Sequence, residues 1–98
     1  IGLQQISSNV PEKFLLSQNY PNPFNPSTKI RFTIRSTEST ELRVFDVLGK
    51  EVSLMKFGVL KPGSYEADFS ARDLPSGIYF YRITSGEFAD TKRMILIK

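Results

Sequence analysis

The side chains that most often carry enzymatic chemistry are missing from this sequence. Its 98 residues include no histidine and no cysteine. Histidine is the commonest general base and the commonest metal ligand, and a Ser-His-Asp arrangement cannot form without it. Without cysteine, neither disulfides nor thiolate metal sites are possible. The residue types present therefore predict that the chain is not an enzyme.

Carboxylates are the remaining chemical candidates, because acid pairs can hydrolyse glycosides and oxygen clusters can hold calcium. The acidic residues considered are Asp46, Glu51, Asp68, Asp73 and Asp90. They are spread over different predicted strands and turns, and no calcium-loop spacing occurs. The six glycines stand singly, so no phosphate-cradling loop is present. We expect no catalytic residue, no metal and no cofactor.

Charge and hydropathy argue against two further classes of protein, those that bind nucleic acid and those that span a membrane. Thirteen Lys and Arg against ten Asp and Glu give a net charge of +3, and basic residues are scattered except at Lys92 and Arg93. A phosphate-tracking surface needs clustered basic residues, so nucleic acid is not an expected partner. No apolar run reaches the roughly 20 residues of a bilayer span, so no membrane-spanning segment is predicted.

Short segments of alternating apolar and polar residues make up most of the chain. In "STKIRFTI" Ile30, Phe32 and Ile34 fall on one face, which is typical of a half-buried strand. Seven such segments and no convincing helix predict an all-β fold, an immunoglobulin-like antiparallel β-sandwich of about seven strands, with a barrel as the minor alternative. The predicted strands are residues 13–20, 27–34, 40–47, 50–57, 65–70, 78–85 and 88–98.

Glycine and proline indicate where these strands reverse. Gly49 can adopt a positive φ, which predicts a tight hairpin between the third and fourth strands. Pro62 followed by Gly63 predicts a type II turn. The expected core consists of Ile30, Phe32, Leu42, Val44, Tyr65, Phe69, Tyr79, Tyr81, Ile83, Met94 and Leu96.

The stretch "YPNPFNPSTKI", residues 20–30, contains three prolines that cannot donate to a sheet ladder. We interpret it as a rigid, extended crossover from the first strand to the second. Asn22 and Asn25 are expected to bond nearby backbone groups, and Tyr20 and Phe24 to anchor the segment to the sandwich.

The first residues differ from the rest in lacking periodicity. Residues 1–12, "IGLQQISSNVPE", are interpreted as a linker or the tail of an upstream domain, and residues 13–98 as the folded domain. Because the chain begins at Ile1 without an initiating Met, we expect it to be a fragment or a processed product.

Four blocks of sequence together resemble one known family. They are "FLLSQNYPNPFNPSTKIRFTI", "ELRVFDVLGKEV", "GSYEADFSARDLPSGIYFYRI" and "TKRMILIK", spanning about residues 11–98. Their order and spacing resemble the type A C-terminal sorting domain of the type IX, or Por, secretion system. The resemblance implies a non-catalytic immunoglobulin-like signal domain that directs a periplasmic cargo protein, joined upstream in the same chain, across the outer membrane.

The resemblance also implies partners and a destination. The outer-membrane secretion machinery would recognise the domain, a sortase-like peptidase would often remove it, and the cargo would be secreted or attached to the outer cell surface. The family's signal elements fall on Pro75, Ser76, Gly77, Tyr79, Lys92, Arg93, Met94, Ile95, Leu96, Ile97 and Lys98.

The last segment also suggests a recognition mode by its own chemistry. A basic pair followed by an apolar strand and a terminal carboxylate could be offered to a receptor as an added strand. The alternative is an ordinary last strand closing the sandwich, with Lys92, Arg93 and Lys98 as solvated residues that discourage edge pairing.

A second function stays open, because the chain contains eight Phe and four Tyr but no Trp. Exposed aromatic rings can stack on sugars, although alternation favours core packing for these residues. The alternative function is a structural or carbohydrate- and surface-binding accessory module appended to a secreted hydrolase.

Overall fold

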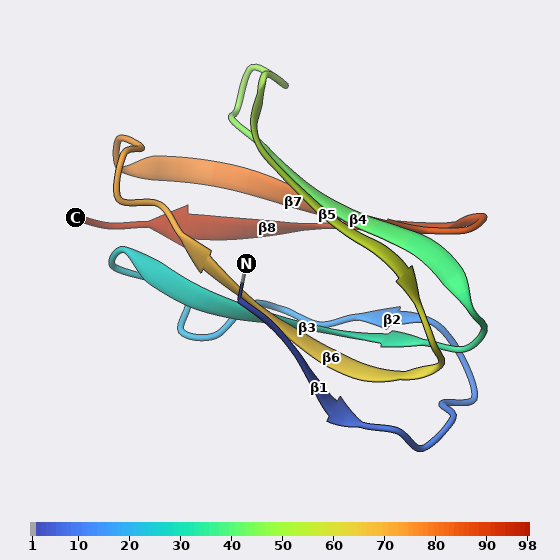
Figure 1. Ribbon diagram of the computed structural model, residues 1–98. Helices are drawn as coiled ribbons and strands as arrows, with labels where there is room; N and C mark the ends of the chain where they lie inside the picture. Colours follow the sequence, from blue (N-terminus) through green and yellow to red (C-terminus); the bar gives the residue numbers. More distant parts are fainter. Residues whose placement is uncertain (1) are drawn as a thin grey trace.

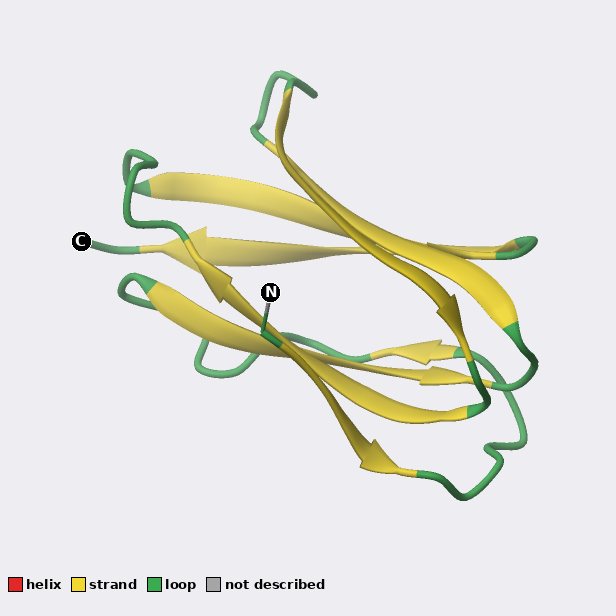
Figure 2. Ribbon diagram, in the orientation of Figure 1, coloured by secondary structure: helices red, strands yellow, loops and turns green. Residues whose placement is uncertain are grey.

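The protein folds as two packed sheets of strands joined by loops (Figures 1 and 2). The computed structural model describes residues 2–98. One sheet has the order β1-β6-β3-β2 and the other β5-β4-β7-β8, and all strand pairs are antiparallel. The predicted all-β sandwich is confirmed. The strands are β1 (Leu3–Ser7), β2 (Leu15–Leu16), β3 (Ser27–Ile34), β4 (Glu38–Phe45), β5 (Glu51–Leu60), β6 (Gly63–Ser70), β7 (Gly77–Ser85) and β8 (Phe88–Leu96).

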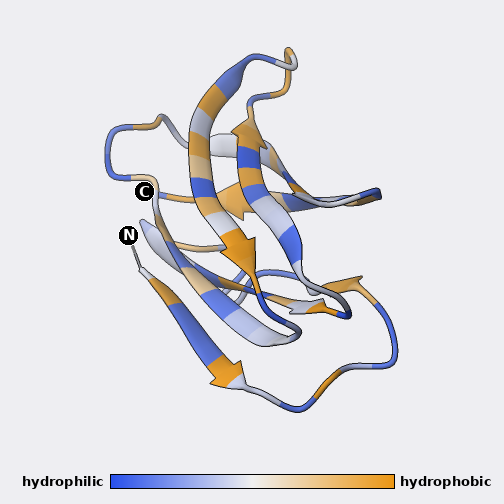
Figure 3. Cartoon of the chain, turned by 45° about the vertical axis from the view of Figure 1, so that its right-hand side comes forward, coloured by the Kyte–Doolittle hydropathy of each residue, from blue (hydrophilic) through white to orange (hydrophobic). Residues whose placement is uncertain are grey.

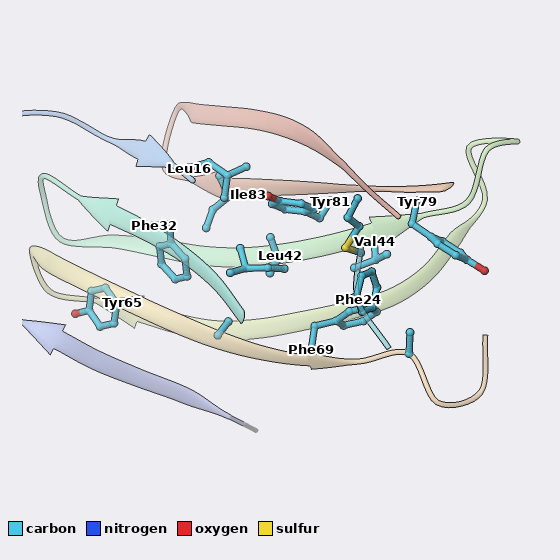
Figure 4. Close-up of a cluster of buried hydrophobic side chains, with 14 of the residues drawn as sticks. Leu16, Phe24, Phe32, Leu42, Val44, Tyr65, Phe69, Tyr79, Tyr81 and Ile83 are labelled. Carbon is cyan, nitrogen blue, oxygen red and sulfur yellow. The ribbon is translucent and has the colours of Figure 1, made fainter. Parts of the chain in front are cut away.

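The core lies between the sheets and follows from the period of two in the strands (Figure 3). Ile30 and Phe32 of β3 pair with Ala67 and Tyr65 of β6, and all four side chains are buried. Figure 4 shows apolar side chains from both sheets filling the space between them. All eleven predicted core residues are buried; the others are Leu16, Phe24, Ile34, Ala67 and Ala71.

The hairpin predicted at Gly49 is confirmed. β4 and β5 pair on either side of it, and Gly49 has a φ of 82°. The Asp46 carboxylate accepts hydrogen bonds from the backbone N–H groups of Leu48 and Lys50, both at 2.9 Å. A short acidic side chain thus satisfies the donors that the tight turn leaves unpaired.

The predicted type II turn at Pro62 and Gly63 is wrong. Such a turn needs a φ near +80° at its second central residue, whereas Gly63 has a φ of 154°. The reason is topological, since β5 and β6 belong to different sheets and the chain turns a corner between them. A Cβ at Gly63 would lie 2.5 Å from the Ser7 carbonyl oxygen, so glycine also allows β1 to approach.

Residues 1–12 contain regular structure that their sequence did not suggest. β1 pairs with β6, with Leu3 opposite Ala67 and Gln5 opposite Tyr65. Leu3–Ser7 thus supply an additional strand that the sequence analysis did not predict. β1 is mostly exposed and is held by backbone hydrogen bonds, so no hydrophobic alternation marks it.

The first predicted strand, residues 13–20, is much shorter than expected. Regular pairing is confined to β2, Leu15–Leu16, opposite β3. Beyond it the pairing with β3 becomes irregular. It continues through a hydrogen bond from the Ser17 N–H to the Arg31 carbonyl and an isolated bridge between Tyr20 and Lys29.

Within residues 2–98 no helix has the length and apolar character needed to cross a membrane.

Candidate functional site

The two predicted signal segments meet at one end of the sandwich. The β6–β7 connection carries Pro75 and Ser76, and it lies beside the last residues of the chain (Figure 1). In the pairing of β7 with β8, Gly77 is opposite Leu96 and Tyr79 is opposite Met94. We call the surface formed by Arg72, Pro75, Ser76, Ile97 and Lys98 the signal end.

Hydrogen bonds join the parts of the signal end. The Lys98 N–H donates to Ser76 Oγ at 3.0 Å, and its ammonium group donates to the Arg72 carbonyl. The Tyr79 hydroxyl donates to the Pro75 carbonyl at 2.6 Å and so fixes the turn from the side of β7. Burial raises the pKa of Tyr79, so this hydroxyl keeps its proton to a higher pH than a free tyrosine does.

Burial divides the predicted signal residues into two groups. Tyr79, Met94 and Leu96 are core residues, each at most 4% exposed. Their side chains therefore close the sandwich and are not available to a partner while the domain is folded. The exposed members are Pro75, Ser76, Gly77, Arg93, Ile97 and Lys98, whereas Lys92 and Ile95 are half-buried.

The outer edge of β8, which faces away from β7, is occupied by residues 18–24. The Phe24 N–H donates to the Ile95 carbonyl at 2.9 Å, and the Ile97 N–H donates to the Phe24 carbonyl at 3.0 Å. Asn22 Oδ1 accepts from the Ile95 N–H at 2.9 Å, and Gln18 Nε2 donates to the Arg93 carbonyl at 2.6 Å. In the folded domain, these groups are not free to pair with an added receptor strand.

Residues 20–30 form a closed loop and not the extended crossover that we predicted. Backbone bonds of 3.0 Å in both directions join Tyr20 and Lys29, so the segment returns to β3 of its own sheet. Phe24 is 2% exposed, which confirms its predicted role as an anchor. Tyr20 is 80% exposed, so its predicted anchoring role is wrong.

A buried polar network that the sequence analysis missed holds this loop. The Tyr81 hydroxyl accepts from the Asn19 N–H at 2.8 Å and donates to the Ser17 carbonyl at 2.7 Å. The Asn19 side chain donates to Thr28 Oγ1 at 3.0 Å. Burial raises the pKa of Tyr81 to about 12. The one sequence signal for this network was the asparagine-rich composition of the loop. The Asn22 side chain, however, bonds the Ile95 N–H of the remote strand β8 and not nearby backbone.

A groove of about 510 Å³ adjoins the signal end, between the β4–β5 turn and the β6–β7 connection. Its lining includes Val47, Leu48, Pro75, Ser76 and Ile78. Leu48 is 90% exposed and Val47 is 63% exposed. Exposed apolar side chains beside a hollow are typical of protein interaction sites.

The described residues offer little for metal chemistry. Among residues 2–98 no group of three or more His, Cys, Asp or Glu side chains is placed to hold a metal ion. Across the same residues no buried side-chain nitrogen or oxygen lacks a hydrogen-bond partner. What the signal end can do is present hydrogen-bonding, basic and apolar groups to another protein.

Comparison with known families gives the class of the protein, a non-catalytic signal domain. The family model described as "Secretion system C-terminal sorting domain" matches residues 18–98, and the chain belongs to this family. The domain signals the secretion of cargo through the Por, or type IX, system and interacts with that machinery. Its cargo is secreted or placed at the surface by way of the periplasm. A search of curated proteins found no match.

Proposed function

We propose that the outer-membrane part of the secretion machinery recognises the folded domain at the signal end. The observation that carries this proposal is the contact of Lys98 with Ser76 and Arg72, which makes one surface from the two predicted signal segments. Arg93 extends this surface along β8, and the apolar groove at Leu48 and Ile78 borders it.

The predicted signal residues have two different roles. Pro75, Ser76, Lys92, Arg93 and Lys98 contact the partner. The buried Tyr79, Met94 and Leu96 act indirectly, by holding the turn and the last strand together. Gly77 has a φ of 155°, a conformation that favours glycine and lets β7 begin directly after the turn.

The cargo is joined through residues 1–12, and residues 13–98 form the sorting domain proper. β1 pairs with β6 and so holds the connection close to the sandwich. After passage across the outer membrane, a sortase-like peptidase separates cargo from domain, and the cargo stays at the outer surface or is released.

The test is an export assay in cells that have the type IX machinery. A periplasmic reporter is fused ahead of residues 1–98, and the extracellular fraction of the reporter is measured. The variant Lys92→Ala/Arg93→Ala/Lys98→Ala should reduce export strongly. It removes the three cations among the predicted signal residues, and none of the three is a core residue.

The matched control is Arg35→Ala/Lys56→Ala/Lys61→Ala, which removes three exposed cations away from the signal end. Arg35 and Lys61 flank the paired ends of β3 and β6 that are farthest from Ser76, and Lys56 is on β5, at the opposite edge of the sheet from β8. Thermal unfolding of both variants checks that each remains folded. If both variants reduced export equally, net charge would be the cause and the signal end would not be the recognised surface. The mass of the extracellular reporter reports on removal of the domain.

A further inference from the structure

A different surface, on the outer face of the sheet that contains β3 and β6, carries an exposed aromatic ring. Tyr20 is 80% exposed, whereas every other Phe and Tyr in residues 2–98 is buried or half-buried. The sandwich core therefore does not require this ring. An exposed ring of this size is a candidate for binding a ligand that has an apolar face.

Two hollows adjoin Tyr20. The larger, of about 610 Å³, is lined by Tyr20, Pro21 and residues 27–29 and 68–70. The smaller, of about 370 Å³, is lined by Ser17, Gln18, Tyr20, Lys29, Arg31 and Glu66. The larger volume is within the roughly 300–1,000 Å³ that is usual for small-molecule sites.

Charged side chains beside Tyr20 form ion pairs with one another. Lys29 Nζ lies 2.8 Å from Asp68 Oδ1 and 3.5 Å from Glu66 Oε1, and Arg31 Nε lies 2.7 Å from Glu66 Oε2. Their backbones are paired, with Lys29 opposite Asp68 and Arg31 opposite Glu66. Donors and acceptors are thus presented from two hydrogen-bonded strands and not from a loop.

The charges of this group cancel. Two cations face two carboxylates, so the surface has no excess charge to attract a phosphate, a sulfate or a uronic acid. Hydrogen bonding to Arg31 lowers the pKa of Glu66, and hydrogen bonding to Asp68 raises the pKa of Lys29. Both shifts favour the ionised forms.

We propose that this surface binds a neutral glycan built of pyranose rings. A pyranose has an apolar C–H face, which can stack on Tyr20, and a rim of hydroxyl groups that both donate and accept hydrogen bonds. Lys29 and Arg31 are donors to that rim, and Glu66 and Asp68 are acceptors. None of Tyr20, Lys29, Arg31, Glu66 and Asp68 is a predicted signal residue, so a domain that is still joined to its cargo can hold that cargo to a polysaccharide.

The test measures binding of the full 98-residue chain to soluble cellohexaose, xylohexaose and mannohexaose by calorimetry and by NMR titration. At least one of these should bind, and Tyr20→Ala should weaken binding by roughly tenfold or more. Tyr20→Phe keeps the ring and should retain most of the affinity. Leu48→Ala, which truncates a 90% exposed side chain at the β4–β5 turn, is the matched control and should bind as the unmodified chain does.

Three results would overturn the proposal. The first is no binding to any of the three oligosaccharides at millimolar concentration. The second is binding that Tyr20→Ala leaves unchanged. The third is tighter binding of the acidic glycans alginate or polygalacturonate, titrated in the same way, than of any of the three neutral oligosaccharides. Because the assay uses the isolated chain, its failure says nothing about export, and failure of export says nothing about glycan binding.

Discussion

The backbone of Phe24 is hydrogen-bonded to the backbone of Ile95 at 2.9 Å, across the two sheets of the sandwich. Ile97 returns a second bond of 3.0 Å to the Phe24 carbonyl, which makes an isolated parallel bridge. The Phe24 ring enters the core and lies edge-on to Phe69, with ring centroids 6.3 Å apart. One residue of the proline-rich loop thus closes the end of the domain at which the signal segments meet.

Truncation of this residue should destabilise the whole domain. Phe24→Ala is expected to lower the free energy of unfolding by about 3–5 kcal/mol, because it leaves a cavity in the core. Urea denaturation followed by circular dichroism measures the change. Tyr20→Ala removes a ring from the same loop that is 80% exposed, and should change the free energy by less than about 0.5 kcal/mol. Equal losses in the two variants would contradict the assigned roles.

The side chain of Asn22 should protect one amide of the terminal strand. It accepts a hydrogen bond from the Ile95 N–H, which points away from β7. Asn22→Ala should therefore speed hydrogen exchange at Ile95 and cost about 0.5–1.5 kcal/mol of stability. The Ile97 amide, which donates to the Phe24 carbonyl, should be much less affected and is the internal control. Fast exchange at both amides in the unmodified chain would show that the loop does not hold this edge.

The Tyr81 hydroxyl should be required for the loop structure. Tyr81→Phe leaves the Asn19 N–H and the Ser17 carbonyl without their partner. Because Asn19 is only 2% exposed, the expected loss is about 1–3 kcal/mol. Chemical denaturation measures it. Tyr65→Phe is the matched control, since the Tyr65 hydroxyl bonds a single carbonyl, that of Lys61, near the surface. The control should lose less stability than Tyr81→Phe.

Stability should fall at alkaline pH because of the same residue. The pKa of Tyr81 is about 12 in the folded domain and near 10 in an unfolded chain. The folded state therefore retains the proton more strongly, and its contribution to stability is complete below pH 10. That contribution is lost as the pH rises from about 10 to about 12. Denaturation at a series of pH values should show this decline, and Tyr81→Phe should show a shallower one.

The β4–β5 turn offers a test of backbone conformation alone. Gly49 has a φ of 82°, and an added Cβ would meet no atom within 4 Å. Gly49→Ala should therefore cost about 1–2 kcal/mol from the left-handed backbone and nothing from steric contact. Thermal unfolding measures the loss. The neighbouring variant Leu48→Ala, with a 90% exposed side chain, should have almost no effect.

Local sequence patterns were informative wherever burial alternates along a strand. The apolar positions of β3, β6 and β7 recur every second residue, and all the core residues predicted from that period are buried. The absence of His and Cys argued against catalysis, and the resemblance of the four sequence blocks to a known family implied a sorting domain. Alternating burial and composition depend only on residue types and on neighbours along the chain, so they can be recognised in one sequence.

Tertiary structure alone decided the features that depend on remote backbone partners. β1 is a polar edge strand paired with β6. Residues 18–24 bond the outer edge of β8, and Lys98 bonds Ser76 in the β6–β7 connection. Backbone hydrogen bonds are the same for every residue type except proline, so they leave no periodic mark in the sequence. The exposure of Tyr20 has the same origin, since a loop that closes on Lys29 directs one aromatic ring inward and the other into solvent.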